Sequence, residues 1–315
     1  MTNLLADGVL AGDARAIARA ISLIEDEAPE GTDLIRAIYS RTGRAYLVGV
    51  TGPPGAGKST LVDRMVGEIR QNRPELSVGV IAVDPTSPFS GGAVLGDRLR
   101  MQGHASDAGV FIRSMATRGH LGGLARTTSD AALVLDAAGR DVVMIETVGV
   151  GQDEVDIIAT ADVSIVTLVP GAGDDVQALK AGIMEIADIF VVNKADREGA
   201  DRLLAAIESN LTLQAFGPGE WRPPILQTVA TTARGVPELL DAVWKFRSQA
   251  AQPGTTRRRR RSESRLRDLV AQRVMQSLER DVLAPGEFAA LAERVAAREI
   301  DPYTAADELL SRLRR

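Results

Sequence analysis

Short apolar runs rich in β-branched residues alternate with helical stretches between residues 45 and 250. The runs are continuously hydrophobic, which is typical of parallel strands that are buried on both faces. Strands that alternate with helices predict an α/β fold, a mostly parallel sheet flanked by helices, in which ligands bind at the carboxyl ends of the strands. The expected strands are YLVGV, VGVIAV, VFI, DVVMIE, VSIVTLV, IFVVN and PILQTV.

The helical spacing of apolar residues predicts an extension at each end of this domain. Residues 1–44 are expected to form an N-terminal helical extension, in which Asp13 is placed to cap the helix ARAIARAISLIE. Residues 251–315 are expected to be a linker and a C-terminal helical dimerisation arm. The five arginines at 257–261 are expected in the solvated linker, with a partner or nucleic-acid contact as the alternative. Short amphipathic helices cannot bury an apolar face alone, so we expect the arm to dock on its own domain or, by preference, on a second copy in a homodimer.

Composition narrows the class of function. The formal net charge of −5 argues against a general nucleic-acid-binding protein, and no stretch approaches the length of about eighteen apolar residues that a membrane span needs. We therefore expect a cytoplasmic protein with no nucleic-acid partner and no membrane partner. Cysteine is absent and only two histidines are present, His104 and His120, which excludes disulfides and Cys/His zinc sites. Any metal ion must be bound by oxygen.

The most informative short motif is GPPGAGKST, which follows the expected strand YLVGV and opens a helix. Gly52, Gly57, Lys58 and Ser59 match the G-x-x-x-x-G-K-[ST] pattern of P-loop NTPases in the strand–loop–helix context that the pattern requires. Backbone N–H groups of such a loop surround phosphate oxygens, the lysine bridges the outer phosphates and the serine hydroxyl binds Mg²⁺. The predicted phosphate-site residues are Gly52, Pro53, Pro54, Gly55, Ala56, Gly57, Lys58, Ser59 and Thr60.

A second motif, VVNKAD, indicates guanine as the base. Asn193, Lys194 and Asp196 form N-K-x-D after an expected strand, where the carboxylate of Asp196 can accept hydrogen bonds from guanine N1–H and the 2-amino group. The stem of Lys194 can pack over the base. In TVATTARG, Ala230 is expected to offer its backbone to the guanine oxygen, while Val229 stands where related proteins have serine. The expected bound nucleotides are therefore GTP and GDP.

Three acidic residues stand at strand ends or in adjoining loops and are candidate partners of Ser59 at a Mg²⁺ ion. They are Asp84 in VIAVDPTSP, Asp97 in LGDRLRM and Glu146 in MIETVGVGQ. Taken singly, Asp84 and Glu146 could simply end strands, and Asp97 could cap a helix. Beside a P-loop, the sequence predicts that they form the metal site with Ser59, directly or through water.

Six segments together resemble the MeaB/ArgK family of P-loop GTPases, which accompany adenosylcobalamin-dependent methylmalonyl-CoA mutase. The likeness covers residues 45–250 strongly and both helical ends more loosely. RSMATRGHLGGLA discriminates best, because generic GTPases have no counterpart to it. The segments are GPPGAGKST, VDPTSPFSGGAVLGDRLRM, RSMATRGHLGGLA, IETVGVGQ, VPGAGDDVQALKAGIMEIAD and VNKAD.

The resemblance implies roles for individual residues. The segment from Asp84 to Arg100 is similar to switch I, and Arg100 is a candidate charge stabiliser or inhibitory switch contact. Gly149 would donate its backbone N–H to the γ-phosphate, and Glu146 would hold a metal-bound water. GAGDDVQALK resembles switch III, in which Lys180 would communicate with the nucleotide site and the mutase. The alternative for Lys180 is a solvated helix residue.

The implied function is a Mg²⁺-dependent GTPase that gates adenosylcobalamin transfer into methylmalonyl-CoA mutase and protects the mutase from inactivation, with C-terminal helices that match the family's dimerisation arm. GTP would be hydrolysed by in-line attack of water, with Lys58 and Mg²⁺ stabilising the developing charge. The residue after Gly149 is Val150, not the glutamine that many fast GTPases use to orient water. This substitution suggests the hypothesis of a slow hydrolase whose active geometry is completed by a partner.

Two other classes of function stay open. A metallocentre-assembly GTPase that carries nickel would share the acidic switch but normally needs His or Cys ligands, and this chain has only two isolated histidines. A P-loop kinase would position a small acceptor molecule and would not need the guanine-reading N-K-x-D.

Overall fold

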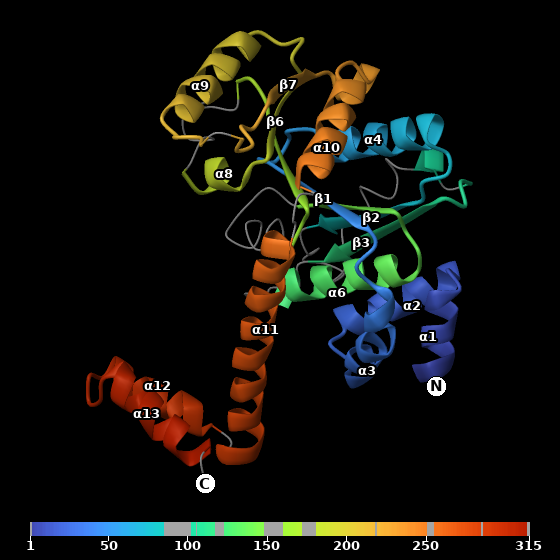
Figure 1. Ribbon diagram of the computed structural model, residues 1–315. Coiled ribbons are helices and arrows are strands. Elements are labelled where there is room, and N and C mark those ends of the chain that lie inside the picture. Colours follow the sequence, from blue (N-terminus) through green and yellow to red (C-terminus); the bar gives the residue numbers. More distant parts are fainter. Residues whose placement is uncertain are drawn as a thin grey trace. The chain divides into compact units, whose positions relative to one another are not determined.

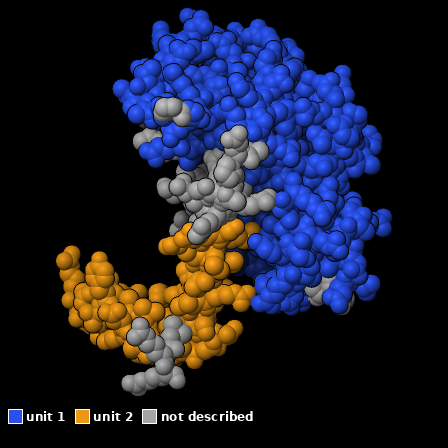
Figure 2. All heavy atoms as spheres, in the orientation of Figure 1, with its two compact units in different colours: residues 1–254 blue, residues 255–315 orange. Residues whose placement is uncertain are grey.

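The computed structural model describes residues 2–84, 102–104, 106–116, 123–147, 160–171, 181–217, 219–250, 255–284 and 286–313. The chain folds as two compact units, residues 1–254 and residues 255–315 (Figure 2). The first unit contains a sheet and the helices that cover it, and the described part of the second unit consists of helices and short turns.

The first unit is built on a parallel sheet whose strands, in the described part of the chain, have the order β3-β2-β4-β1-β5-β6-β7 (Figure 1). Every neighbouring pair in this order is parallel. All the runs predicted as strands take part in this sheet, which confirms the predicted fold class. The strands are β1 (Tyr46–Thr51), β2 (Val78–Asp84), β3 (Val110–Ala116), β4 (Val142–Glu146), β5 (Val163–Leu168), β6 (Ile189–Asn193) and β7 (Ile225–Thr228).

Helices cover both faces of the sheet, because successive strand side chains point to opposite faces and both sets are apolar (Figure 1). On one face, Val48 and Val50 of β1 belong to a core shared with α4 and α10. On the other face, β2 and β4 pack with α6, while β5 and β6 pack with α8 and α9. The helices are α4 (Lys58–Asn72), α6 (Gly123–Ala137), α8 (Ala181–Ile186), α9 (Ala200–Thr212) and α10 (Val236–Ala250).

The N-terminal residues form three helices that share a core with α6 and with β2 and β4. Asp13 caps the second helix, because its carboxylate accepts the N–H of Ala16 at 2.7 Å. This helix spans the predicted segment ARAIARAISLIE, so the predicted cap is confirmed. The helices are α1 (Thr2–Leu10), α2 (Ala14–Glu25) and α3 (Pro29–Ile38), followed by the short turn η1 (Tyr39–Arg41).

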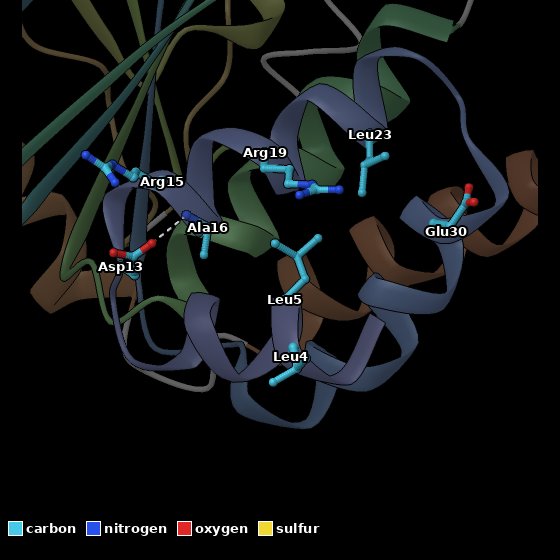
Figure 3. Close-up of a pocket in the computed structure, with 8 residues that line it drawn as sticks. All are labelled: Leu4, Leu5, Asp13, Arg15, Ala16, Arg19, Leu23 and Glu30. Carbon is cyan, nitrogen blue, oxygen red and sulfur yellow. Dashed lines mark hydrogen bonds between the residues drawn. The ribbon is translucent and has the colours of Figure 1, made fainter. Parts of the chain in front are cut away.

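A hollow with a volume of ≈ 520 Å³ lies among these N-terminal helices (Figure 3). Leu5 of α1 points toward Arg19 and Leu23 of α2 across this space (Figure 3). Its lining is mostly apolar and includes none of the residues predicted to bind nucleotide. The hollow is therefore not part of the predicted nucleotide site.

Three aspartates form hydrogen bonds that link the amino ends of neighbouring strands. Asp141, Asp162 and Asp188 stand directly before β4, β5 and β6. The carboxylate of Asp162 accepts the N–H of Leu47 at 2.9 Å, while the backbone N–H of Asp162 donates to the Leu47 carbonyl at 2.7 Å. The other two aspartates make the same reciprocal pair with a serine at the amino end of a neighbouring strand. These bonds fix the relative register of the strands.

A fourth aspartate fixes the start of β1, the strand that leads into the phosphate-loop motif. Asp136 of α6 is 5% exposed, and its carboxylate accepts the backbone N–H groups of Gly43 at 2.5 Å, Arg44 at 3.1 Å and Ala45 at 2.9 Å. A buried carboxylate with several backbone donors is well compensated for its loss of water. Asp136 thereby ties α6 to the entrance of β1.

The second unit begins with α11 (Thr255–Ser277), which contains the five arginines at 257–261. The prediction that these arginines form a linker was wrong: arginine is a good helix former, and the local preference of the run agrees with the helix that follows. Leu266, Val270 and Val274 recur every four residues of α11 and are exposed, so they form an apolar stripe. The remaining elements are the π-helical turn η4 (Leu278–Val282), α12 (Glu287–Ala296) and α13 (Pro302–Leu313).

Among the helices that the structure describes, none combines the length and the apolar character needed to span a bilayer.

Candidate functional site

The motif GPPGAGKST forms a loop between β1 and α4, and two of its glycines are required by close contacts. Gly52 has φ +142°, and a Cβ at this position would lie 1.9 Å from the carbonyl oxygen of Thr167 in β5. Gly57 has φ +84°, and a Cβ there would lie 2.6 Å from Nδ2 of Asn193. Both conformations favour glycine, and both positions lack room for a side chain. The loop is therefore packed closely against two neighbouring strand ends.

Lys58 and Ser59 open α4 and are both buried. The ammonium of Lys58 donates to the carbonyl oxygens of Gly52 at 2.7 Å and Pro53 at 3.2 Å. These acceptors belong to the loop itself, so the lysine head lies where phosphate oxygens could replace them. The Ser59 hydroxyl donates to Oε1 of Glu146 at 2.6 Å, which brings two of the predicted metal-site residues together.

Glu146 is the last residue of β4 and lies opposite Val50 of β1 in the sheet register. Its carboxylate is 4% exposed and contacts Ser59. Both groups are hard oxygen donors, which is the chemistry that Mg²⁺ prefers. The described residues contain no cluster of three or more His, Cys, Asp or Glu side chains that could bind a metal by themselves. The residues thus fit a magnesium ion that takes its other ligands from a nucleotide and water.

Asn193 joins the phosphate loop to the predicted base site. It is the last residue of β6, is 1% exposed, and donates from Nδ2 to the carbonyl oxygen of Ala56 at 2.8 Å. Its Oδ1 accepts from the hydroxyl of Thr228 at 3.0 Å and from the N–H of Ala230 at 3.2 Å. One amide therefore connects three segments that are far apart in the sequence.

Lys194 and Asp196 follow Asn193 at this edge. Lys194 has φ +55°, which is uncommon for a residue with a side chain, and its ammonium donates to the carbonyl oxygen of Gly55 at 2.8 Å. The side chain of Asp196 is exposed two residues later. Ala230, which begins the short turn η3 (Ala230–Thr232), is buried beside Asn193. Hydrogen bonds thus join the phosphate loop, the start of N-K-x-D and Ala230.

Several predicted site residues cannot be placed. Asp97, Arg100, Gly149 and Lys180 lie outside the residues that the structure describes. Asp84 is the last residue of β2, and its backbone pairs with Ala116 of β3, but its side chain is not among those that the structure describes. The roles assigned to these residues stay predictions.

Three threonine hydroxyl groups at the same edge were not predicted from the sequence. Thr147 donates to Thr51 at 2.9 Å, Oγ1 to Oγ1, and Thr228 donates to Asn193. All three threonines are buried. Each of these threonines stands in or next to a motif described above. The pairing between residues 51 and 147 could not be predicted, because it depends on the order of the strands in the sheet and not on a local sequence pattern.

A family model described as "Methylmalonyl Co-A mutase-associated GTPase MeaB" matches residues 17–282. A protein of Pyrococcus abyssi named "Putative GTPase" is 51% identical over 317 residues, which cover 99% of this chain and 97% of that relative. The mouse protein "Methylmalonic aciduria type A homolog, mitochondrial" is 31% identical over 322 residues, which cover 96% of this chain and 77% of the relative.

Among solved structures, one titled "Crystal structure of LAO/AO transport system kinase" superimposes with a TM-score of 0.73 at 28% sequence identity. The superposition covers 100% of this chain and 98% of the other. The similarity therefore extends over both helical ends as well as the sheet.

Proposed function

We propose, from the premise that the chain belongs to the MeaB family of methylmalonyl-CoA mutase-associated GTPases, that it regulates an adenosylcobalamin-dependent methylmalonyl-CoA mutase. As a member of this family, the protein is a GTPase that hydrolyses GTP to GDP and phosphate. The proposed task of hydrolysis is to control cofactor loading of the mutase and to protect it from inactivation. The observation that carries the proposal is the family match, which spans the nucleotide site and part of each flanking helical region.

In the proposed mechanism, the phosphate loop surrounds the nucleotide with backbone N–H groups at the amino end of α4. Lys58 exchanges its bonds to the Gly52 and Pro53 carbonyls for bonds to the outer phosphate oxygens. A bound Mg²⁺ ion would supply positive charge beside the γ-phosphate, where water attacks in line. Ser59 would bind the ion directly and Glu146 through water, with Asp84 and Asp97 as the predicted further partners.

Guanine recognition is proposed to rest on Asp196, which lies next to a segment held against the phosphate loop. Asn193 and Lys194 bond to the carbonyls of Ala56 and Gly55, so the start of N-K-x-D is fixed relative to the loop. The exposed carboxylate of Asp196 can then accept two hydrogen bonds from guanine, which adenine cannot match.

The client assignment is tested by mixing the purified chain with a candidate methylmalonyl-CoA mutase. We expect the two proteins to co-elute in size-exclusion chromatography and the mutase to increase the rate of phosphate release from GTP. The Lys58→Ala variant is the control for the source of the phosphate, since it should lose turnover whether or not the mutase is present. If the mutase neither associates nor stimulates turnover, the client proposal fails, while the GTPase activity stands.

The apolar stripe of α11 supports a second element of the proposal, a homodimer formed through the second unit. Leu266, Val270 and Val274 expose a helix face that another copy could cover. Light scattering should give twice the chain mass of 33.4 kDa for the unaltered protein. Val270→Glu should give the single mass, and the matched control Arg273→Glu, at an exposed charged residue of the same helix, should stay dimeric.

A further inference from the structure

Two buried threonines connect the end of β4 to the end of β1. Thr51 is the last residue of β1, directly before Gly52, and Thr147 directly follows Glu146. Their Oγ1 atoms are 2.9 Å apart, with Thr147 as the donor, and the two residues are 0% and 2% exposed. A bond between two hydroxyls in such a dry environment is hard to replace with water once it is lost.

The bond is made by the residue that directly follows Glu146, one of the predicted metal-site residues. The backbone N–H of Thr147 donates to the Val50 carbonyl at 3.1 Å, so the main chain beyond β4 still follows β1. One residue earlier, Glu146 reaches Ser59 in the phosphate loop at 2.6 Å. The threonine pair and the Glu146–Ser59 bond therefore hold the phosphate-loop motif at both its beginning and its end.

We propose that the hydroxyl of Thr147 is a positioning group for GTP hydrolysis: its bond to Thr51 orients the chain at Glu146 so that this carboxylate faces Ser59. The proposal rests on the proposed role of Glu146 at the metal. A metal ligand, or a residue that holds a metal-bound water, acts well only if its orientation is fixed by its neighbours. The threonine pair supplies that support from β1, the strand that also positions the loop.

A purely structural role for the pair makes a different prediction. If the bond only stabilises the fold, its loss lowers the free energy of unfolding and leaves the kinetics of the folded protein unchanged. If it positions Glu146, its loss lowers kcat and raises the Mg²⁺ concentration for half-maximal turnover, with little change in the affinity for GDP measured without Mg²⁺. The two readouts can be measured on the same variants.

The test compares Thr147→Val, which removes the hydroxyl and keeps the branched shape, with Thr147→Ser, which keeps the hydroxyl. We expect Thr147→Val to lower kcat roughly tenfold, the effect of losing about one buried hydrogen bond from the transition state, and Thr147→Ser to stay within roughly twofold of the unaltered protein. Thr51→Val removes the same hydroxyl–hydroxyl bond from its other end and should also lower kcat. Because the two changes share this bond, the loss of kcat in the double variant should be smaller than the product of the two single losses.

The matched control is Thr128→Val in α6. Thr128 is 0% exposed, and its hydroxyl has no hydrogen-bond partner in the described part of the chain. This variant should keep the kcat and the Mg²⁺ dependence of the unaltered protein. It controls for the general effect of placing valine at a buried threonine position.

Three outcomes overturn the proposal: unchanged kcat in Thr147→Val, an equal loss in Thr147→Ser, or a loss of kcat matched by an equal loss of GDP affinity. Glu146→Gln in the same assay separates the positioning role of Thr147 from the metal role of Glu146, on which it rests. If Glu146→Gln keeps full Mg²⁺-dependent turnover, the metal role of Glu146 fails. If Glu146→Gln loses turnover but Thr147→Val does not, the positioning role of Thr147 alone fails.

Discussion

The two edges of the sheet use similar polar residues with different partners. At the amino edge, the carboxylates of Asp136, Asp162 and their neighbours accept hydrogen bonds from backbone N–H groups of the same fold. At the carboxyl edge, Lys58 bonds to carbonyls of its own loop and Glu146 bonds to Ser59. At the amino edge the acceptors are carboxylates and the donors are backbone N–H groups of the fold, whereas at the carboxyl edge the cation of Lys58 and the Ser59–Glu146 pair are groups whose present bonds a nucleotide and its metal could replace. The hydrogen-bond partner, more than the residue type, therefore distinguishes the carboxylates of the amino edge from Glu146, the carboxylate predicted to serve the metal site.

The comparison predicts that substitutions at the carboxyl edge change ligand binding, and that substitutions at the amino edge change stability. The largest effect is expected for Lys58→Ala, which removes the cation beside the outer phosphates. GTP affinity should fall at least about 1000-fold, as expected for several lost charge-assisted bonds. Isothermal titration calorimetry measures this loss, and Lys245→Ala, at an exposed lysine of α10, is the matched control. Retention of full affinity would contradict the phosphate-loop assignment.

The next largest effect is expected for Asp196→Asn. The amide can still accept from the N1–H of the base, but its amino group opposes the 2-amino group of guanine, so the preference for GTP over ATP should fall by roughly 100-fold. Xanthosine triphosphate carries an oxygen at that position and should bind the variant better than GTP does. Competition binding with the three nucleotides measures both changes. An unchanged ratio of GTP to ATP affinity would count against the base assignment.

At the amino edge, Asp136→Ala tests the structural half of the comparison. Loss of the carboxylate leaves the N–H groups of residues 43–45 without their acceptor, which should lower the free energy of unfolding by about 2 kcal/mol. Urea unfolding measures the loss, and Asp241→Ala on the exposed face of α10 is its control. The KM for GTP of the folded variant should not change. A changed KM with an unchanged free energy of unfolding would show that Asp136 affects nucleotide binding and not stability, which contradicts the comparison.

The smallest effect is expected for the ion pair between Arg70 of α4 and Asp107 before β3. The hydrogen bond from Arg70, followed by the N–H of Gly109, lowers the pKa of the Asp107 carboxyl below its usual value. A lowered folded-state pKa favours the ionised carboxylate, so its contribution to stability is complete above the unfolded pKa of about 3.9 and is lost as pH falls through the folded-state value.

The pH dependence of this contribution is tested by comparing the free energy of unfolding of the unaltered protein with that of Asp107→Asn. Urea unfolding should show the variant to be less stable at pH 6, and the gap should narrow as the pH is lowered below about 4. A gap that stays constant with pH would mean that packing, not charge, accounts for the difference.

The sheet could be predicted from the sequence because its strands are buried on both faces. A parallel strand such as IFVVN is apolar at nearly every position, and this continuous run is visible without any knowledge of its neighbours. The cap at Asp13 was predictable for a similar reason, since the cap and the helix it begins are adjacent in the chain. The phosphate and base motifs share this property, because their residues are consecutive.

The missed contacts join residues that are distant in the sequence. Asp136 meets the entrance of β1 across more than ninety residues, and Thr147 meets Thr51 across a similar separation. Such pairs depend on strand order and register, which a single sequence does not specify at the level of one hydrogen bond. The arginine run was wrongly predicted for a local reason. Its charge suggested a linker, but arginine is a good helix former and the run lies in α11.

Asn193 and Lys194 fix the distance between the predicted base site and the predicted phosphate site, because both side chains bond to carbonyls of the loop. A nucleotide that has docked at one end presents its other end at a high effective concentration. Guanosine and pyrophosphate supplied separately lack that advantage and should bind far more weakly than GDP. The predicted site would therefore select molecules by the distance between their two ends as well as by the chemistry of each end.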